Sequence, residues 1–355
     1  MSSSAISRRT FVAAAAAAAV AVVTPARPVA SAEPNANPTI AARRRFFGAE
    51  HVDPRTGEVD PDKVILSWFG VTSFAMAIAG DVFLLDAWVP RGEFSNRVPT
   101  SPTELAALAP SHIFIGHGHF DHAADAAEIA SLSGATIVGT EEHCRQLDEQ
   151  AATDLRTHPL PLDRTEFMLG GVTGRAVRHL HSGLRAPRGE QAPLVLAPDF
   201  TPTVEDPPTL QDLQHLADHA GDEEGGSLLY QFEVGGFVLT WHDSSGPLVT
   251  DAPQVLDTLR ELPASSVQIG SIQGYNQYTN GLGDTLDYIR ALRPDVFVPS
   301  HHDNWLPPVS APAAAYEPRL REAVASLPNP PEVRMLVDPT DYLRPSLLTF
   351  DLTTS

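Results

Sequence analysis

The chain has 355 residues, of which 43% are hydrophobic, so it is long enough to bury one large core or two smaller ones. Its formal net charge of -20 at pH 7 disfavours binding to nucleic acid or to an anionic membrane surface. The single cysteine, Cys144, excludes an internal disulfide and a metal site built from several thiolates.

The first 32 residues have the features of an export signal. Residues 7–12 form the twin-arginine pattern SRRTFV, an alanine-rich apolar run extends to Val23, and Ala30–Ala32 is a small-residue cleavage site. The apolar run is shorter than the roughly 20 residues that a membrane-spanning helix needs. We therefore expect transient contact with the twin-arginine export machinery and cleavage after Ala32. The mature protein is then extracellular or in the periplasm and cell envelope, without stable membrane insertion.

Residues 33–62 contain Pro, Asn and Ala, then the arginine run Arg43–Arg45 and two Asp-Pro pairs. This composition is typical of a connecting segment. We expect a linker that becomes a surface arm, followed by one folded domain at 63–355.

Short apolar segments separated by glycine turns predict the first strands of that domain. They lie at Val64–Phe69, Phe74–Ala79 and Val82–Leu85. Asp86 ends the third strand, where its carboxylate either binds backbone amides or supports a nearby site. Ser101-Pro-Thr-Glu104 predicts the start of a helix.

Four potential metal ligands fall within six residues after the buried strand predicted at His112–Ile115, namely His117, His119, Asp121 and His122. In an extended chain His117 and His119 point to the same side, so one metal fits there and a neighbouring metal fits Asp121 and His122. Buried imidazole and carboxylate groups lose hydration and need a partner. A ligand set without thiolate favours zinc, iron or manganese.

Helix and strand patterns then alternate. We predict a helix at Ala124–Leu132 with Asp125 as a first-turn charge, a strand at Ala135–Gly139, and a helix from Thr140 that carries His143 as a structural or surface residue. The alternation over Val172–His181 places Val177, His179 and His181 on one face of a strand.

Residues 184–226 interrupt the strand pattern and are rich in Pro, Asp and Glu, with one helical stretch at Leu210–Ala220. His215 and His219 have metal-compatible spacing there, but their neighbours are solvated acids and no HExxH is present. An insertion of this length between site-forming strands often forms a lid or pocket wall. We expect substrate selectivity to reside in it.

The remaining elements follow in order. A hairpin about Gly235-Gly236 leads to His242 and Asp243, and a later buried strand leads to His301 and His302. The predicted elements are strands at Leu228–Val234, Phe237–Trp241, Val267–Ile272, Val296–Ser300 and Leu347–Leu352, and helices at Asp284–Leu292 and Tyr316–Ser326.

The segment HGHFDH at 117–122 resembles the HxHxDH signature of the metallo-beta-lactamase fold superfamily of hydrolases. Residues 64–70 and 83–87 resemble that family's opening hairpin, and the resemblance covers most of the chain from about residue 60 to the end. It implies an α/β (α+β) fold, a four-layer αββα sandwich with two mixed sheets face to face and helices outside.

The resemblance also implies the other ligands. His181 matches the third histidine of one metal, with His179 as the alternative one pleat earlier. Asp243 matches the carboxylate that bridges two metals, and His301 matches the last histidine ligand, with His302 as the alternative. The implied set is His117, His119 and His181 for one metal, Asp121, His122 and His301 for the other, and Asp243 between them.

A protein of this kind is expected to be a secreted metal-dependent hydrolase. Two divalent ions, zinc with manganese or iron as alternatives, would lower the pKa of a bound water to form a hydroxide, which Asp121 would orient while it shuttles the proton. The substrate would be a small molecule with an ester, lactone, amide or phosphodiester bond, since the single HxHxDH core with PSHHDNW near the end resembles the lactonase-like and phospholipase-D-like members. The alternatives are a redox enzyme of the dioxygenase type and a non-catalytic secreted binding protein. The sequence does not indicate the oligomeric state.

Overall fold

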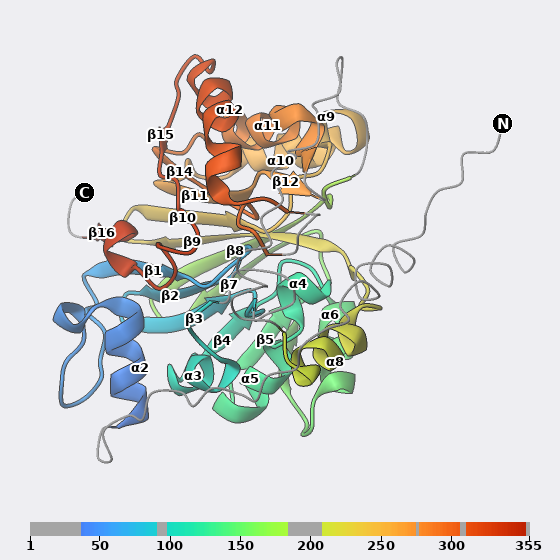
Figure 1. Ribbon diagram of the computed structural model, residues 1–355. Coiled ribbons are helices and arrows are strands. Elements are labelled where there is room, and N and C mark those ends of the chain that lie inside the picture. The colour runs from blue at the N-terminus through green and yellow to red at the C-terminus, as the bar shows by residue number, and fades with distance from the viewer. Residues whose placement is uncertain (1–36, 91–97, 184–207, 275–276, 306–309, 353–355) are drawn as a thin grey trace.

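The computed structural model describes residues 37–90, 98–183, 208–274, 277–305 and 310–352 (Figure 1). The predicted export signal at 1–32 lies outside the described residues, as does the first part of the predicted insertion, residues 184–207. Within the described ranges, no helix is long and apolar enough to cross a membrane.

The first sheet has seven strands in the order β16-β1-β2-β3-β4-β5-β6. Strands β16, β1, β2 and β3 pair antiparallel, whereas β3, β4, β5 and β6 pair parallel. The bounds are β1 Lys63–Trp68, β2 Phe74–Ile78, β3 Asp81–Leu85, β4 His112–Phe114, β5 Thr136–Gly139, β6 Arg156–Pro159 and β16 Thr349–Asp351.

The second sheet also has seven strands, in the order β15-β14-β11-β10-β9-β8-β7. Here β7 to β10 pair antiparallel and β10, β11, β14 and β15 pair parallel. The bounds are β7 Arg164–Leu169, β8 Val172–His179, β9 Ser227–Val234, β10 Phe237–His242, β11 Val267–Ser271, β14 Val296–Ser300 and β15 Glu332–Val333. A separate two-stranded ribbon pairs β12 Gln273–Gly274 with β13 Gln277–Tyr278.

Helices cover the outer faces of both sheets, which confirms the predicted four-layer αββα sandwich (Figure 1). Those outside the first sheet are α2 Pro38–Phe47, α3 Pro102–Ala107, α5 Ala126–Ser133 and α6 Glu141–Gln150. Those outside the second sheet are α9 Leu248–Asp251, α10 Pro253–Glu261, α11 Gly283–Leu292 and α12 Ala313–Ala325. The short α4, Phe120–Ala123, follows β4, and α8, Leu210–His219, lies beside α6.

Aromatic side chains fill the space between the two sheets and fix their relative position. The rings of Phe114 and Phe232 meet edge to face at 4.9 Å, and Tyr230 packs against Phe114 at 5.2 Å. The buried hydroxyl of Tyr230 donates to the backbone oxygen of Ile115 at 3.0 Å, just before the histidine-rich segment. The second sheet therefore holds the chain at the point where β4 ends and the metal-binding pattern begins.

Most predicted strands agree with the structure to within one or two residues, but two predictions need correction. The helix predicted at Ala124–Leu132 begins two residues later, as α5 at Ala126, and a separate short helix, α4, precedes it, with Asp125 between the two. Asp125 is fully buried and accepts a hydrogen bond from the backbone of Val89 at 2.8 Å, so its carboxylate does more than complement a helix end. The strand predicted to reach His181 ends at His179.

The described part of the predicted linker, residues 37–62, is packed against the first sheet. Asn37 caps α2 by accepting from the backbone of Thr39, and Pro38 occupies the first turn, as is typical of helix starts. Phe46 and Phe47 at the end of this helix are fully buried in the core. Arg43 donates to the backbone oxygens of Gly57 and Leu108, so the arginine run is partly structural.

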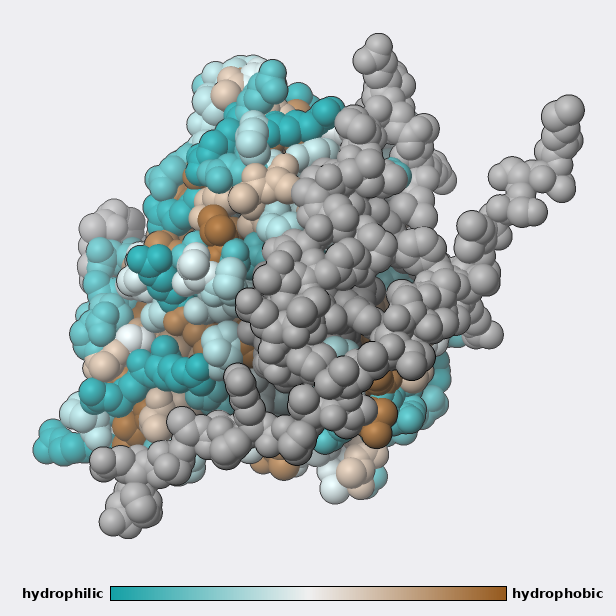
Figure 2. All heavy atoms as spheres, in the orientation of Figure 1, coloured by the Kyte–Doolittle hydropathy of each residue, from teal (hydrophilic) through white to brown (hydrophobic). Residues whose placement is uncertain are grey.

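The described surface is mostly hydrophilic in the part that Figure 2 leaves uncovered. Around α12, Figure 2 shows mainly hydrophilic residues with hydrophobic ones in small spots. The large hydrophobic side chains that are exposed among the described residues are scattered over several elements, at Leu132, Leu162, Met168, Leu210 and Val249.

Truncation of Phe47 tests whether α2 belongs to the core. We expect Phe47→Ala to lower the free energy of unfolding by about 3–5 kcal/mol, because the substitution removes a buried ring and leaves a cavity. Denaturant unfolding measures this loss. Leu162→Ala, at a side chain that is 63% exposed, is the control and should change little; equal effects would contradict the core role of α2.

Candidate metal centre

The structure brings all the predicted ligands together at one edge of the two sheets. Their side chains form three overlapping groups whose potential ligand atoms lie within 4.8 Å of one another. The groups are His117, His119 and His181; His117, His122 and Asp243; and Asp121, His122 and His301. Proximity is thus established for each of these residues, whereas their coordination of a metal remains a prediction.

Each ligand stands where a strand or a short helix ends or begins. His117 and His119 follow β4, and α4 carries Asp121 and His122. The other three come from the second sheet: His181 follows β8, Asp243 follows β10, and His301 follows β14. Strand ends from both sheets converge here, so residues far apart in the sequence share one site.

The first group consists of imidazoles alone. The Nε2 atoms of His117 and His181 face each other at 3.1 Å, and the ring of His119 lies 4.7 Å from that of His117. Burial and the neighbouring imidazoles of His122 and His181 hold the pKa of His117 well below its usual value. A neutral imidazole offers a lone pair, which is the form that a metal requires.

The second group combines carboxylate and imidazole. Oδ2 of Asp121 lies 3.3 Å from Nε2 of His301 and 3.6 Å from Nε2 of His122. Burial favours the neutral form of Asp121, but His122 and His301 outweigh it and lower the pKa of the carboxyl. Burial also opposes the charge on His122, yet Asp121 and Asp86 raise the pKa of this imidazole to about 9. Without metal, the negative charge of Asp121 and the positive charge of His122 stabilise each other.

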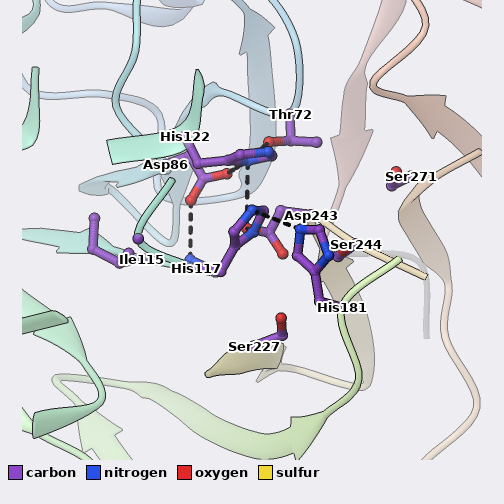
Figure 3. Close-up of polar contacts among 12 residues, drawn as sticks. Thr72, Asp86, Ile115, His117, His122, His181, Ser227, Asp243, Ser244 and Ser271 are labelled. Atoms are coloured by element: carbon purple, nitrogen blue, oxygen red, sulfur yellow. Dashed lines mark hydrogen bonds and ion pairs between the residues drawn. The ribbon is translucent and has the colours of Figure 1, made fainter. Parts of the chain in front are cut away.

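Asp243 lies between the two groups and is fully buried. Figure 3 shows its carboxylate beside His117, where Oδ2 lies 2.7 Å from Nδ1 of His117 and 3.4 Å from Nδ1 of His122. Its Oδ1 has no hydrogen-bond partner among the described residues. Burial and the nearby Asp86 raise the pKa of Asp243 well above its usual value. A buried carboxylate with an unsatisfied oxygen needs positive charge, so the donor set fits divalent cations.

Asp86 combines the two roles that the sequence left open. Its Oδ1 accepts from the backbone of Gly116 at 3.0 Å, and its Oδ2 lies 2.8 Å from Nδ1 of His122 (Figure 3). Asp86 therefore ties down the start of the histidine-rich segment and orients the His122 ring. With the Nδ1 proton directed at Asp86, Nε2 of His122 is left facing Asp121 as a potential ligand atom.

The geometry favours His181 and His301 over the two alternative ligands. Nδ1 of His179 bonds the hydroxyl of Tyr288 at 2.8 Å, on the face of β8 that packs against α11. His302 donates from Nε2 to the backbone oxygen of Leu336 at 2.7 Å and stacks on Trp68. Neither side chain joins a group of potential ligands within the described residues.

Two further residues support the site: Gln273, which had no signal in the sequence, and His242, whose place before Asp243 suggested either a substrate contact or a supporting role. The side-chain amide of Gln273 lies 3.0 Å from Nδ1 of His301 and holds the ring with Nε2 facing Asp121. His242 is buried, donates from Nδ1 to the backbone oxygen of Ser244 and accepts from Gln268, so it fixes the turn that carries Asp243. Burial lowers the pKa of His242 to about 4, in keeping with this neutral role.

The end of the predicted insertion touches the metal-binding loop. The backbone of Gly118 donates to the oxygen of Glu224 at 2.8 Å, and Gln146 joins Gly118 to Glu223. A side chain at Gly118 would meet the oxygen of Glu223 at 2.5 Å, and one at Gly116 would meet Oδ2 of Asp243 at 2.1 Å. Both glycines allow a close approach that any larger residue would prevent. His143 is structural, as predicted, because it caps α6 and bonds Glu224.

The insertion also contacts the region behind the site. His215 on α8 lies 3.2 Å from Oδ1 of Asp125, and His219 pairs with Asp222 at 2.8 Å. These histidines pair with carboxylates and do not join the metal groups found among the described residues, in agreement with the sequence interpretation.

Comparison with known proteins points to one family. Residues 68–301 match the sequence profile of the Metallo-beta-lactamase superfamily. A UPF0173 metal-dependent hydrolase from Pyrobaculum neutrophilum is 37% identical over 126 residues, which are 35% of this chain and 54% of that protein. The chain therefore spans about half the length of this relative. A homologous protein of the same name from Pyrobaculum arsenaticum is 26% identical over 68% of this chain and 84% of its own length.

The fold has a counterpart among solved structures. Igni18, a metallo hydrolase from Ignicoccus hospitalis, superposes with a TM-score of 0.52 over 77% of this chain and 95% of its own. The sequence identity is 18%, so this likeness concerns the fold alone.

Two variants on the same strand end test the choice of the third histidine. We expect His181→Ala to remove bound metal more severely than His179→Ala, because only His181 faces His117 and His119. Metal content of the two purified variants decides between them. Equal losses, or a greater loss from His179→Ala, would overturn the assignment.

Proposed function

Because this chain belongs to the metallo-beta-lactamase superfamily, we propose that it is a metal-dependent hydrolase with two divalent cations, zinc with manganese or iron as alternatives. The observation that carries the proposal is the convergence of His117, His119, Asp121, His122, His181, Asp243 and His301 at one edge of the sandwich. The names of the Pyrobaculum relatives support the same reaction class.

Each cation would be held by one of the groups of neighbouring side chains described above. His117, His119 and His181 would hold one cation, Asp121, His122 and His301 the other, and Asp243 stands between them. When bound, such a pair of cations lowers the pKa of a water molecule toward ~7 and polarises a substrate oxygen.

The side chains of this site have separate tasks. Asp121 is held ionised by its histidine neighbours, so its Oδ2 can accept a proton from the attacking water and orient it. Asp86 and Gln273 keep the rings of His122 and His301 in fixed orientations. Asp243 supplies negative charge between two positive centres that would otherwise repel each other.

The substrate that we propose is a small molecule with an ester, lactone, amide or phosphodiester bond, as in lactonase-like or phospholipase-D-like enzymes. The partly exposed ring of Phe120 supports a substrate with an apolar portion, and the buried Trp88 and Trp305 form a small core behind it. Trp305 meets the ring of His301 edge on at 5.3 Å, and Trp88 packs against both Trp305 and the half-buried Phe120. Phe120 lies in the chain between the ligands His119 and Asp121.

We also propose that the protein is exported, on the basis of the twin-arginine pattern at residues 7–12 and the small residues before Glu33. N-terminal sequencing of the secreted protein is expected to begin at Glu33. Full-length protein with an intact Met1 that stays in the cytoplasm would contradict this proposal.

Metal analysis and a substrate screen test the proposed reaction. The purified protein is expected to carry two metals per chain and to hydrolyse at least one of a set of lactones, phosphodiesters and beta-lactams, with the activity lost on adding a chelator. We expect Asp243→Asn to fold, to lose one metal more readily than the other and to lose most hydrolysis, because the amide cannot supply the bridging charge. Two retained metals and near-normal turnover in Asp243→Asn would refute the bridging role.

A further inference from the structure

The turn between β1 and β2 is buried, whereas most turns lie at the protein surface. Phe69, Val71, Thr72 and Ser73 are all inaccessible to solvent, and Val71 has a left-handed backbone with φ of 48°. A non-glycine residue adopts this conformation only where surrounding contacts impose it. The contacts of Val71 and Thr72 reach several segments that carry the predicted ligands.

Thr72 contacts the segment of His122. Its hydroxyl donates to Oδ2 of Asp86 at 2.6 Å and lies 2.8 Å from Nδ1 of His122 (Figure 3). The Nδ1 atom of His122 thus has two oxygen neighbours at 2.8 Å, one from Thr72 and one from Asp86, and a third from Asp243 at 3.4 Å. Together they fix the ring rotation and keep Nε2 directed at Asp121.

Val71 contacts the segment of His301. The backbone oxygen of Val71 accepts from the backbone of His301 at 3.0 Å, and His301 itself has a left-handed φ of 59°. The backbone nitrogen of Val71 donates to both carboxylate oxygens of Asp303, each at 3.2 Å. The hydroxyl of Tyr342 also donates to this carboxylate, at 2.8 Å. Asp303 therefore holds the turn, and the turn holds the backbone of His301.

A further contact joins the same turn to the strand before Asp243. The indole of Trp241 donates to the backbone oxygen of Thr72 at 3.1 Å, two residues before Asp243. One short turn is thereby connected to His122 through a hydroxyl, to His301 through a carbonyl, and to β10 through an indole.

We propose that the Val71-Thr72 turn positions the metal held by Asp121, His122 and His301, with Thr72 and Asp303 as its positioning residues. The inference rests on the proposed metal centre. Thr72 sets the ring of one ligand and Asp303, through Val71, sets the backbone of another. Both belong to the same half of the centre, so loss of either residue should weaken that metal and spare the metal at His117, His119 and His181.

Stepwise zinc affinities measured by competition with a chromophoric chelator test this inference without any substrate. His181→Ala and His301→Ala assign the two binding steps to the two halves of the centre. Thr72→Val is expected to weaken the step assigned to His301 by about 10–100-fold, the usual effect of removing a residue that orients a ligand. Thr72→Ser, which keeps the hydroxyl, should restore most of the affinity. Asp303→Asn should weaken the same step.

Thr240→Val is the matched control. Thr240 is as fully buried as Thr72, but its hydroxyl bonds Gln231 and Ser265, away from the ligands. The control should leave both steps unchanged, and melting of the metal-free proteins checks that the variants are folded. Visible spectra of the cobalt-loaded proteins should change in Thr72→Val and stay unchanged in Thr240→Val.

Several results would overturn the inference. They are equal weakening of both steps by Thr72→Val, no weakening, failure of Thr72→Ser to restore affinity, or the same loss in Thr240→Val. If Thr72→Val does not fold, Asp303→Asn decides by the same criterion of one weakened step. A wild-type protein that binds two zinc ions but hydrolyses nothing would refute the proposed function and leave this inference standing.

Discussion

The crowding of buried carboxylates and imidazoles at one edge of the sandwich is the constraint on which the rest of the structure depends. Asp86, Asp121 and Asp243 are all buried within a short distance of His122, and they raise the pKa of this imidazole. Like charges in a region of low dielectric repel strongly. Burial raises the pKa of Asp243, repulsion from Asp86 raises it further, and its Oδ1 has no hydrogen-bond partner among the described residues. Divalent cations would offset the repulsion between these buried carboxylates, so the site is understood best as a metal centre.

The two sheets hold these crowded side chains in place because rigid strand ends from both sheets surround the cluster. Each sheet contributes ligands where its strands stop, and the aromatic core between the sheets fixes the distance from one set to the other. The close approach of Asp243 to Gly116 needs a residue without a side chain. Ligand orientation then depends on residues behind the ligands, such as Asp86 and Gln273, whose own positions are set by burial.

The sequence could predict what depends on local pattern. The HGHFDH segment and the apolar strands need only neighbouring residues, whereas the sandwich and the ligands His181, Asp243 and His301 follow from the family resemblance. The polar edge strand β6 lacked an apolar pattern, since all four of its residues are exposed. The composition of residues 33–62 predicts a linker where the structure has the helix α2, because Asn37-Pro38 is compatible with either a linker or a helix start. Arg43, in the same segment, bonds oxygens that are distant in sequence.

The residues that support the ligands could not be predicted for a different reason. Thr72 and His122 are 50 residues apart, and Val71 and Asp303 are 232 residues apart. Such contacts exist only after both sheets have formed, and no sequence spacing predicts them. The ligand chemistry is local, whereas its precise orientation is a property of the whole fold.

Anomalous diffraction from crystals of the zinc-loaded protein, recorded at the zinc edge, tests the central claim most directly. The account predicts two anomalous peaks per chain, one among His117, His119 and His181 and the other among Asp121, His122 and His301, with the Asp243 carboxylate in contact with both. A single peak, peaks at His179 or His302, or an Asp243 carboxylate turned away from the metals would contradict it.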